Sequence, residues 1–250
     1  MAKPRPFIAI VQSKGGVGAT TLALETFTLL PPPAAIIETA GQGMLGHVAP
    51  AGAALTEAGA YARQGSGMAG ALAAERNDRL CIGCEPVSYA VYEPHGIAAV
   101  ARAVSPFRYT VCDAGRWEAA SPEILGHATH IWVVVTPDAR SVMQAMAFLG
   151  PRRDLQEKVT LVENFSEGPS AITTTAFPVV YLPRLPASHG SGGLLKNTGA
   201  YGLALETALG AIFPDAQPEE PRDEAEAGIT RALWRTARAA WAGRRVKREG

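Results

Sequence analysis

The stretch Ser13-Lys14-Gly15-Gly16-Val17-Gly18-Ala19-Thr20-Thr21 decides how the rest of this sequence is interpreted. It follows a short apolar run, Phe7–Val11, and it opens the predicted helix Thr20–Leu30. Glycines let neighbouring backbone N–H groups converge on one anion, and the free N–H groups of a new helix point to the same place. The stretch therefore predicts a phosphate-binding loop. A glycine turn that joins a strand to a helix and binds nothing is the plain alternative.

The loop departs from the common pattern G-x-x-x-x-G-K-[ST] at two positions. Ser13 stands where that pattern has its first glycine, and Ala19 stands where it has the phosphate-binding lysine. Thr20 still offers a hydroxyl to a Mg²⁺ ion between the phosphates. Losing one charge-stabilising contact typically lowers the rate of a reaction by ~10²–10³. We therefore expect nucleotide binding with slow hydrolysis, or with none.

Composition excludes several classes of protein. The chain has 250 residues, 23 basic and 23 acidic side chains, and 47% hydrophobic residues. This balance excludes a largely disordered chain and a broadly basic nucleic-acid-binding protein. The three cysteines make no disulfide framework. No apolar run approaches the ~20 residues that a membrane span needs. We therefore expect a cytoplasmic protein.

Short apolar runs alternate with longer alanine-rich stretches, and the runs do not alternate with polar residues. This pattern predicts an α/β fold: a doubly wound, mostly parallel sheet with helices on both faces. The predicted strands are Phe7–Val11, Ala34–Ile37, Leu80–Cys84, Tyr109–Cys112, Ile131–Val135, Val159–Val162 and Val179–Leu182. The predicted helices are Thr20–Leu30, Leu55–Ala74, Ile97–Val104, Pro122–Gly126, Ala139–Leu149 and Gly199–Ile212.

The chain divides into three predicted parts. Residues 1–213 form the nucleotide-binding domain, residues 214–227 an acidic linker, and residues 228–250 a basic amphipathic helix with two tryptophans. Basic amphipathic helices with tryptophan bind anionic membrane surfaces. The segment Ile229–Arg248 is therefore interpreted in three ways: it docks on the domain's own core, it binds an anionic membrane, or it binds nucleic acid or another partner.

The run from Lys14 to Gly18, followed by Thr20-Thr21, resembles the deviant Walker A motif of the ParA/MinD superfamily of P-loop NTPases, K-G-G-x-G-K-[ST]. The resemblance implies that Lys14 reaches across a nucleotide-sandwiched homodimer to the partner's phosphates. Alanine in place of the second lysine, at Ala19, is similar to the CpaE/TadZ branch of pilus-assembly localisation proteins. The implied nucleotide-binding residues of the loop are Gly15, Gly16, Val17, Gly18, Ala19, Thr20 and Thr21.

Three further blocks carry the resemblance across most of the chain. Glu38 stands where the family has an aspartate that orients the attacking water, and Asp113 ends a segment that looks like switch II, near the water shell of the Mg²⁺. The resemblance therefore implies Lys14, Glu38 and Asp113 as catalytic residues and Thr20 and Asp113 as residues at the metal. It also implies that Asn164 reads adenine and that Pro183 and Leu185 line the face of the base.

Two cysteines have the spacing of a redox or zinc half-site, Cys81-x-x-Cys84. In the predicted strand, residues three apart face opposite sides of the sheet, and no second Cys/His pair stands nearby. Buried small hydrophobic residues are therefore the favoured interpretation, and Cys112 is interpreted in the same way.

The leading hypothesis is an ATP-binding positioning or regulatory protein that uses ATP/ADP and Mg²⁺ to switch between monomer and homodimer. Such a protein organises a cellular assembly through a protein partner, such as a pilus or secretion machine or another cargo. The alternative is a degenerate scaffold of the same fold that does not hydrolyse ATP and acts through protein–protein contacts. A third hypothesis, an ATP-dependent enzyme for a small molecule, ranks last because nothing in the sequence indicates its substrate site.

Overall fold

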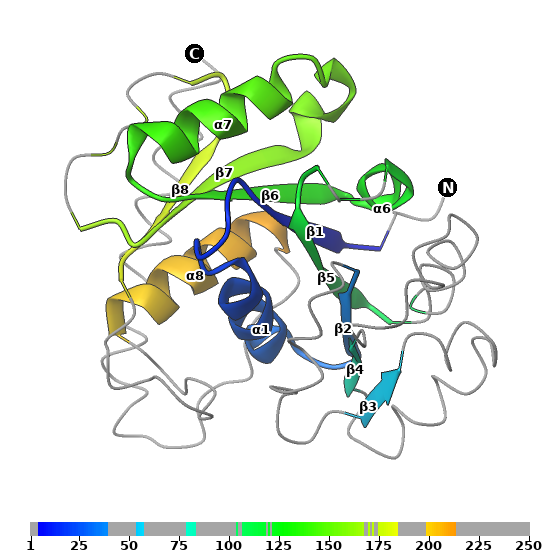
Figure 1. The fold of residues 1–250 in the computed structure, drawn as a ribbon. Helices are drawn as coiled ribbons and strands as arrows, with labels where there is room; N and C mark the ends of the chain where they lie inside the picture. Colours follow the sequence, from blue (N-terminus) through cyan, green and yellow to red (C-terminus); the bar gives the residue numbers. More distant parts are fainter. Residues whose placement is uncertain are drawn as a thin grey trace, which may run out of the picture.

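The computed structural model describes residues 5–39, 54–57, 79–83, 104, 107–118, 120, 122–167, 170, 172, 175–184 and 199–213. Within these residues, eight strands form one sheet (Figure 1). The strands are β1 (Phe7–Gln12), β2 (Ala34–Glu38), β3 (Ala54–Glu57), β4 (Arg79–Gly83), β5 (Tyr109–Arg116), β6 (His130–Val135), β7 (Val159–Asn164) and β8 (Val179–Leu182). The helices are α1 (Ala19–Leu29), α6 (Pro122–His127), α7 (Ala139–Leu149), the 3-10 helix η2 (Arg153–Lys158) and α8 (Gly199–Ile212).

The strand order is β3-β4-β2-β5-β1-β6-β7-β8, and every pair of neighbours is parallel. From β1 the chain moves to β2 on one side of the sheet and later crosses to β6 on the other. In open parallel sheets, ligands bind at the carboxyl ends of the strands where the order reverses in this way. The loop that follows β1 lies at this position.

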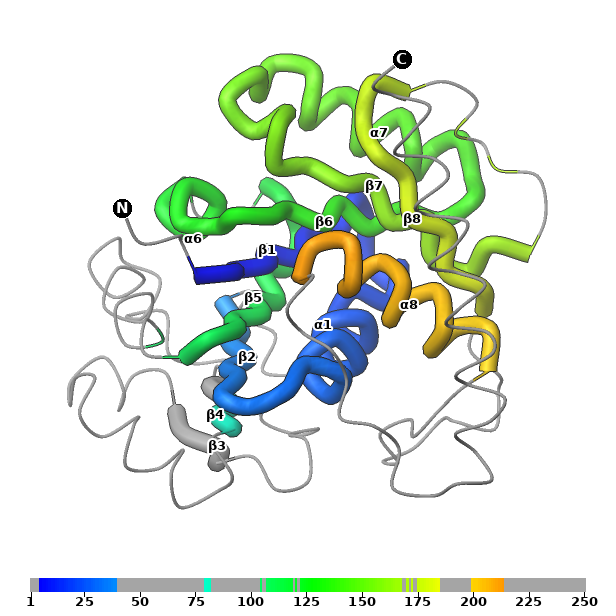
Figure 2. The backbone as a smooth tube through the Cα atoms, turned by 180° about the vertical axis from the view of Figure 1, so that it is seen from behind, coloured from blue at the N-terminus to red at the C-terminus, as the bar shows by residue number. Residues whose placement is uncertain are grey.

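Helices cover both faces of the sheet, as predicted. Ile8 and Ile10 of β1 pack in a core cluster with α1 and α8. Phe7, Ala9 and Val11 point to the opposite face and pack in a second cluster with residues of α6 and α7. Figure 2 shows α1 and α8 on one face of the sheet, and Figure 1 shows α7 beyond it on the other. All six residues of β1 are buried because both of its faces are covered.

The predicted strands all occur, and β5 and β7 exceed their predicted ranges the most. β5 extends to Arg116 and β7 extends to Asn164, so the polar residues Asp113 and Asn164 belong to strands and not to the loops after them. Both side chains are buried at the edge where the carboxyl ends of the strands meet. The sequence prediction ended these strands too early because it followed only the apolar run.

The prediction of a helix over Leu55–Ala74 is wrong at its start. Residues Ala54–Glu57 form the edge strand β3, which pairs with β4 from Ala54 opposite Leu80 to Glu57 opposite Gly83. Alanine-rich composition favours a helix, but pairing with an existing strand overrides so weak a local preference. The rest of that prediction, most of the predicted helix Ile97–Val104 and the segments 214–227 and 228–250 lie outside the described residues.

The predicted helices over Thr20–Leu30, Pro122–Gly126, Ala139–Leu149 and Gly199–Ile212 are confirmed to within one residue at each end. The short 3-10 helix η2 was not predicted. In the part of the chain that the structure describes, no helix has the length and apolar character to cross a bilayer.

Candidate nucleotide-binding site

The loop between β1 and α1 has the backbone that its glycines predict. Gly16 and Gly18 have φ angles of 78° and 82°, in the left-handed region that residues with a Cβ rarely adopt. Gly18 is the N-cap of α1, and no side chain caps the first turn of this helix. The free N–H groups of that turn are therefore available to an anion.

The loop is anchored on one side and open on the other. Val17 and Ala19 are buried in the core cluster that packs against α1. Gly15 and Gly16 are exposed, and a Cβ added at either would meet no atom within 4 Å. The open side of the loop therefore presents backbone that a phosphate can approach closely.

Ser13, which replaces the first glycine of the common pattern, ties the loop to the other face of the sheet. Its N–H donates to the carbonyl oxygen of Val134 at 3.1 Å, and its Oγ lies 2.7 Å from Oγ of Ser141 in α7. Both hydroxyls are fully buried. The departure at Ser13 therefore makes a structural contact between the loop and the start of α7.

Lys14 lies at the start of the loop and forms an ion pair within its own chain. Its Nζ is 2.7 Å from Oδ2 of Asp138, the N-cap of α7. Asp138 also accepts from the backbone N–H of Ser141 at 2.9 Å, which caps the first turn of α7, and from the hydroxyl of Thr136. The hydrogen bond from Lys14, followed by those from Thr136 and Ser141, lowers the pKa of Asp138 well below its usual range.

Thr20 and Asp113 meet at the first turn of α1, although they lie in different parts of the sequence. The hydroxyl Oγ1 of Thr20 donates to Oδ2 of Asp113 at 2.5 Å, and the N–H of Gly115 donates to Oδ1 at 3.2 Å. Asp113 is 2% exposed, and its burial raises the pKa of the carboxyl despite these two hydrogen bonds. A hydroxyl and a desolvated carboxylate are oxygen ligands of the kind that Mg²⁺ prefers.

Glu38 is the next acid along the sheet edge. It is 2% exposed and stands opposite Asp113 in the register between β2 and β5, where the N–H of Thr39 donates to the carbonyl oxygen of Asp113 at 3.0 Å. Both acids therefore lie at the carboxyl ends of adjacent strands, beside the loop.

Asn164 and Phe165 approach the loop from the end of β7. Asn164 is 3% exposed, and its Nδ2 donates to the carbonyl oxygen of Val17 at 2.8 Å. A Cβ at Gly18 would lie only 2.6 Å from this Nδ2 and 3.2 Å from Cζ of Phe165. Glycine is therefore required at position 18 by a close approach as well as by its φ angle.

The overall fold resembles that of known structures. A plasmid partition protein from Borrelia burgdorferi, solved with AMPPNP, superposes with a TM-score of 0.59 at 14% identity over 85% of this chain and 99% of its own. MinD from Aquifex aeolicus gives 0.56 at 14% identity over 86% and 100%. A ParA family ATPase from Chlorobium tepidum gives 0.54 at 16% identity over 85% and 94%. This chain has the ParA/MinD fold.

The comparison of sequences alone finds no such likeness. No protein-family model matches this chain, and no curated protein sequence matches it significantly. The ParA/MinD fold is therefore shared at an identity where sequence similarity is no longer detected and the likeness lies in the architecture.

On the ParA/MinD fold, the structure brings most of the predicted site residues together. Pro183 follows β8 directly, beside the loop after β7, and Leu185 lies outside the described residues. Sequence reasoning missed Lys14's partner Asp138 and the serine pair Ser13–Ser141. It also missed Phe165, because no local pattern marks an aromatic residue that packs on a loop far away in the sequence.

The cysteines behave as predicted for buried residues. Cys81 and Cys112 are fully buried free thiols on opposite faces of the sheet, and burial raises the pKa of each to about 12. Thiols with such pKa values stay protonated near neutral pH and are poor nucleophiles and metal ligands. Cys84 lies outside the described residues, and within those residues no three His, Cys, Asp or Glu side chains are grouped as a metal site.

Proposed function

We propose that this protein is an ATP-binding switch of the ParA/MinD type, with ATP or ADP bound at the loop Gly15–Thr21. The observation that carries the proposal is the 2.5 Å contact between Thr20 Oγ1 and Asp113 Oδ2. It supports the proposal because two oxygen atoms of the kind that Mg²⁺ prefers lie beside the free backbone N–H groups at the start of α1, which could bind an anion. The fold is also that of solved proteins with AMPPNP and with Mg-ADP.

The residues present fit a nucleotide with its Mg²⁺. Gly15 and Gly16 open outward, so phosphate oxygens can reach the backbone without meeting a side chain. Thr20 and Asp113 would hold the Mg²⁺, which neutralises phosphate charge when it is bound. A cation beside Asp113 also offsets the cost of burying this carboxylate. Asn164 and Pro183 would contact the base, together with Leu185.

We propose that hydrolysis is slow. Ala19 is 1% exposed and brings no positive charge to the phosphates. Catalysis of phosphoryl transfer depends mainly on positioning and charge stabilisation, so this loss lowers the rate more than the affinity. Glu38, which is buried beside Asp113, would orient the attacking water through its carboxylate.

We propose that ATP drives formation of a homodimer in which Lys14 contacts the partner's phosphates. Lys14 is 35% exposed at the edge of the loop, where its long side chain can leave Asp138 and extend outward. The dimer would present a new surface to a protein partner of a larger assembly. A pilus or secretion machine is our first candidate, because alanine at position 19 is similar to the CpaE/TadZ branch.

The basic segment Ile229–Arg248 extends this proposal to contact with a membrane. We propose that it either docks on the domain or holds the protein at the inner face of an anionic membrane, and we expect nucleic acid to be a weaker partner. Binding to anionic liposomes, compared between the full chain and a chain that ends at residue 227, tests the membrane role. Equal binding by both chains contradicts that role.

The alternative is a scaffold of the same fold without a nucleotide cycle. Ser13 favours it, because this residue makes a structural contact in place of a phosphate-binding glycine. Ala19 favours it as well. The alignment of Thr20 with Asp113 favours the switch, because a scaffold needs no buried acid there. An ATP-dependent enzyme would reveal itself by hydrolysis that requires a small-molecule co-substrate.

The deciding experiment combines nucleotide binding with molecular mass. Fluorescent ATP is titrated with and without Mg²⁺, and light scattering on a sizing column is recorded with no nucleotide, with ADP–Mg²⁺ and with ATP–Mg²⁺. We expect nucleotide binding to depend on Mg²⁺, and we expect a dimer with ATP–Mg²⁺ but not in the other two conditions. Absence of binding supports the scaffold, and binding without any change of mass contradicts the dimer switch.

Two lysine variants test the role of Lys14. We expect Lys14→Ala to bind ATP and to remain monomeric. Lys158→Ala is the matched control, because Lys158 is an exposed lysine in η2 whose Nζ donates to the carbonyl oxygen of Gly126, away from the loop. Loss of the dimer in both variants would contradict a specific role of Lys14 at the partner's phosphates.

A further inference from the structure

Phe165 is an aromatic residue in an unusual position at the candidate site. Among the described residues, it is the one residue other than glycine with a positive φ, at 65°. Its Cζ lies 3.2 Å from the place where Gly18 would carry a Cβ, so the tip of the ring lies close to Gly18, the N-cap of α1. The rest of the side chain remains partly exposed. An uncommon backbone conformation therefore holds an aromatic ring beside the phosphate loop.

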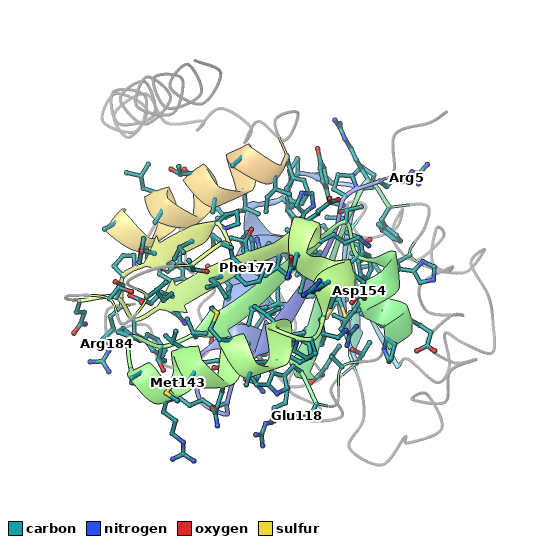
Figure 3. The ribbon with its side chains drawn as sticks, turned by 90° about the horizontal axis from the view of Figure 1, so that it is seen from above. Arg5, Glu118, Met143, Asp154, Phe177 and Arg184 are labelled. Carbon is teal, nitrogen blue, oxygen red and sulfur yellow. The ribbon has the colours of Figure 1, made fainter. Side chains whose placement is uncertain are left out.

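Arg184 lies over this ring from the neighbouring loop. Its Cζ is 5.9 Å from the centroid of Phe165, and its Nε is 3.9 Å from Oε1 of Glu167. The N–H of Ser166 donates to the carbonyl oxygen of Leu182 at 3.0 Å, which joins the loops after β7 and β8. Both contacts of Arg184 are long and its side chain is 66% exposed. Figure 3 shows it at the rim of the molecule. Arg184 can therefore move without disturbing the core.

Asn164, the residue expected to read the base, is already engaged by the protein. Its Nδ2 donates to the carbonyl oxygen of Val17 at 2.8 Å, and its Oδ1 accepts from the N–H of Phe165 at 3.1 Å. One N–H and one lone pair of the amide remain. These can still make two hydrogen bonds to the edge of a base, whereas stacking against the face of the base has to come from another surface.

We propose that Phe165, covered by Arg184, is the stacking surface for the nucleotide base and that it selects purines over pyrimidines. The inference rests on the proposed binding of ATP at the loop. A base would lie within reach of Phe165 if its phosphates lie at Gly15–Thr21, because the ring lies close to Gly18 of that same loop. Stacking on an aromatic ring and beneath a guanidinium group gains more from the larger purine ring system.

Competition binding tests the proposal. Wild type and Phe165→Leu are titrated with fluorescent ATP, and ATP, CTP and inorganic tripolyphosphate are the competitors. We expect wild type to prefer ATP over CTP, and Phe165→Leu to lose roughly tenfold in affinity for ATP. The same variant should lose less affinity for CTP and keep its affinity for tripolyphosphate, which has no base.

Three further variants separate stacking from structural damage. Phe165→Tyr keeps the ring and should keep the preference for ATP over CTP. Phe177→Leu is the matched control and should leave the preference unchanged. Phe177 is also a partly buried aromatic residue, but it packs against the core cluster that contains Phe7, Ala9 and Val11. Arg184→Gln should weaken ATP binding about threefold without changing tripolyphosphate binding.

The outcomes are distinct. An ATP-to-CTP preference that is equal in wild type and Phe165→Leu overturns the stacking surface and leaves ATP binding intact. Failure of wild type to bind ATP and tripolyphosphate overturns the proposed function and this inference together. If Phe165→Leu does not fold, Arg184→Gln decides, because its exposed side chain is dispensable for folding; unchanged ATP affinity in that variant overturns the proposal.

Discussion

Lys14 and Asp138 form an ion pair of 2.7 Å that joins the start of the phosphate loop to the N-terminus of α7. The pair lies within one chain, whereas the role that we propose for Lys14 lies across a dimer. The ammonium group of Lys14 has three donors, but it is held at Asp138 within its own chain, and turning it outward to a partner's phosphates would lengthen or break that contact. Dimer formation therefore has to compete with this contact.

Asp138→Asn removes the charge that holds Lys14 and keeps an oxygen that can cap α7 at the N–H of Ser141. Exposed ion pairs contribute about 0–1 kcal/mol, so we expect the ATP-bound dimer to form at protein concentrations lower by up to roughly fivefold. Light scattering over a dilution series measures this. Asp154→Asn, which breaks the exposed pair between Arg152 and Asp154 instead, should change nothing. A weaker dimer in Asp138→Asn contradicts the competition.

Asp113→Asn should raise the stability of the ligand-free protein and weaken its Mg²⁺-dependent binding of ATP. Asp113 is buried and its pKa is raised by desolvation, so the ionised carboxyl lowers the stability of the ligand-free protein. We expect the variant's free energy of unfolding without ligand to rise by about 1 kcal/mol, the scale of gain seen when a strained functional site is relieved. Urea unfolding without ligand measures it.

The same variant should lose more than tenfold in Mg²⁺-dependent affinity for ATP, because an amide is a weaker ligand for Mg²⁺ than a carboxylate. Binding measured in EDTA should change little. A variant that is both less stable and unchanged in its Mg²⁺ dependence would contradict the assignment of Asp113 as the metal-binding acid.

Gly18→Ala should damage both the loop and the domain. Its Cβ would lie 2.6 Å from Nδ2 of Asn164, at a φ of 82°. We expect a loss of about 2–3 kcal/mol in the free energy of unfolding and no measurable ATP binding. Gly210→Ala in α8 is the control, since its Cβ meets no atom within 4 Å and alanine favours a helix. That control should be neutral or slightly stabilising, and equal losses in both variants would contradict the close approach at Gly18.

His130 should make stability depend on pH. Burial lowers its pKa, and its ring lies edge-on to Phe213 at 6.2 Å, with Thr129 Oγ1 3.0 Å from Nδ1. Because the folded pKa is lower than the unfolded one, the unfolded chain binds the proton more readily. Above the ordinary histidine pKa near 6.5, His130 is neutral in both states and does not reduce the free energy of unfolding. As the pH falls from there through the folded pKa, the unfolded chain gains the proton first and the free energy of unfolding decreases. Urea unfolding at pH 7.5 and 5.5 should show a larger loss for wild type than for His130→Phe; equal losses would assign the pH dependence to other groups.

Much of the architecture could be predicted from short-range pattern. The strand β1 and the helix α7 follow from apolar runs and periodicity, and the left-handed glycines of the loop follow from residue type alone. The edge strand β3 could not be predicted, because Ala54–Glu57 has no strand pattern of its own and is a strand only through its pairing with β4. Local propensity decides little where a neighbouring strand supplies hydrogen bonds.

The sequence by itself determined the glycine-rich loop after β1 and the layered parallel sheet, because both depend on interactions within a few residues and on burial of apolar runs. Only the tertiary structure decided which side chains meet at the loop. Asp113 reaches Thr20, Asp138 reaches Lys14 and Phe165 reaches Gly18 because the strand order places their loops at one edge. Strand order and register are set by the packing of the whole sheet, and no local run of residues encodes them.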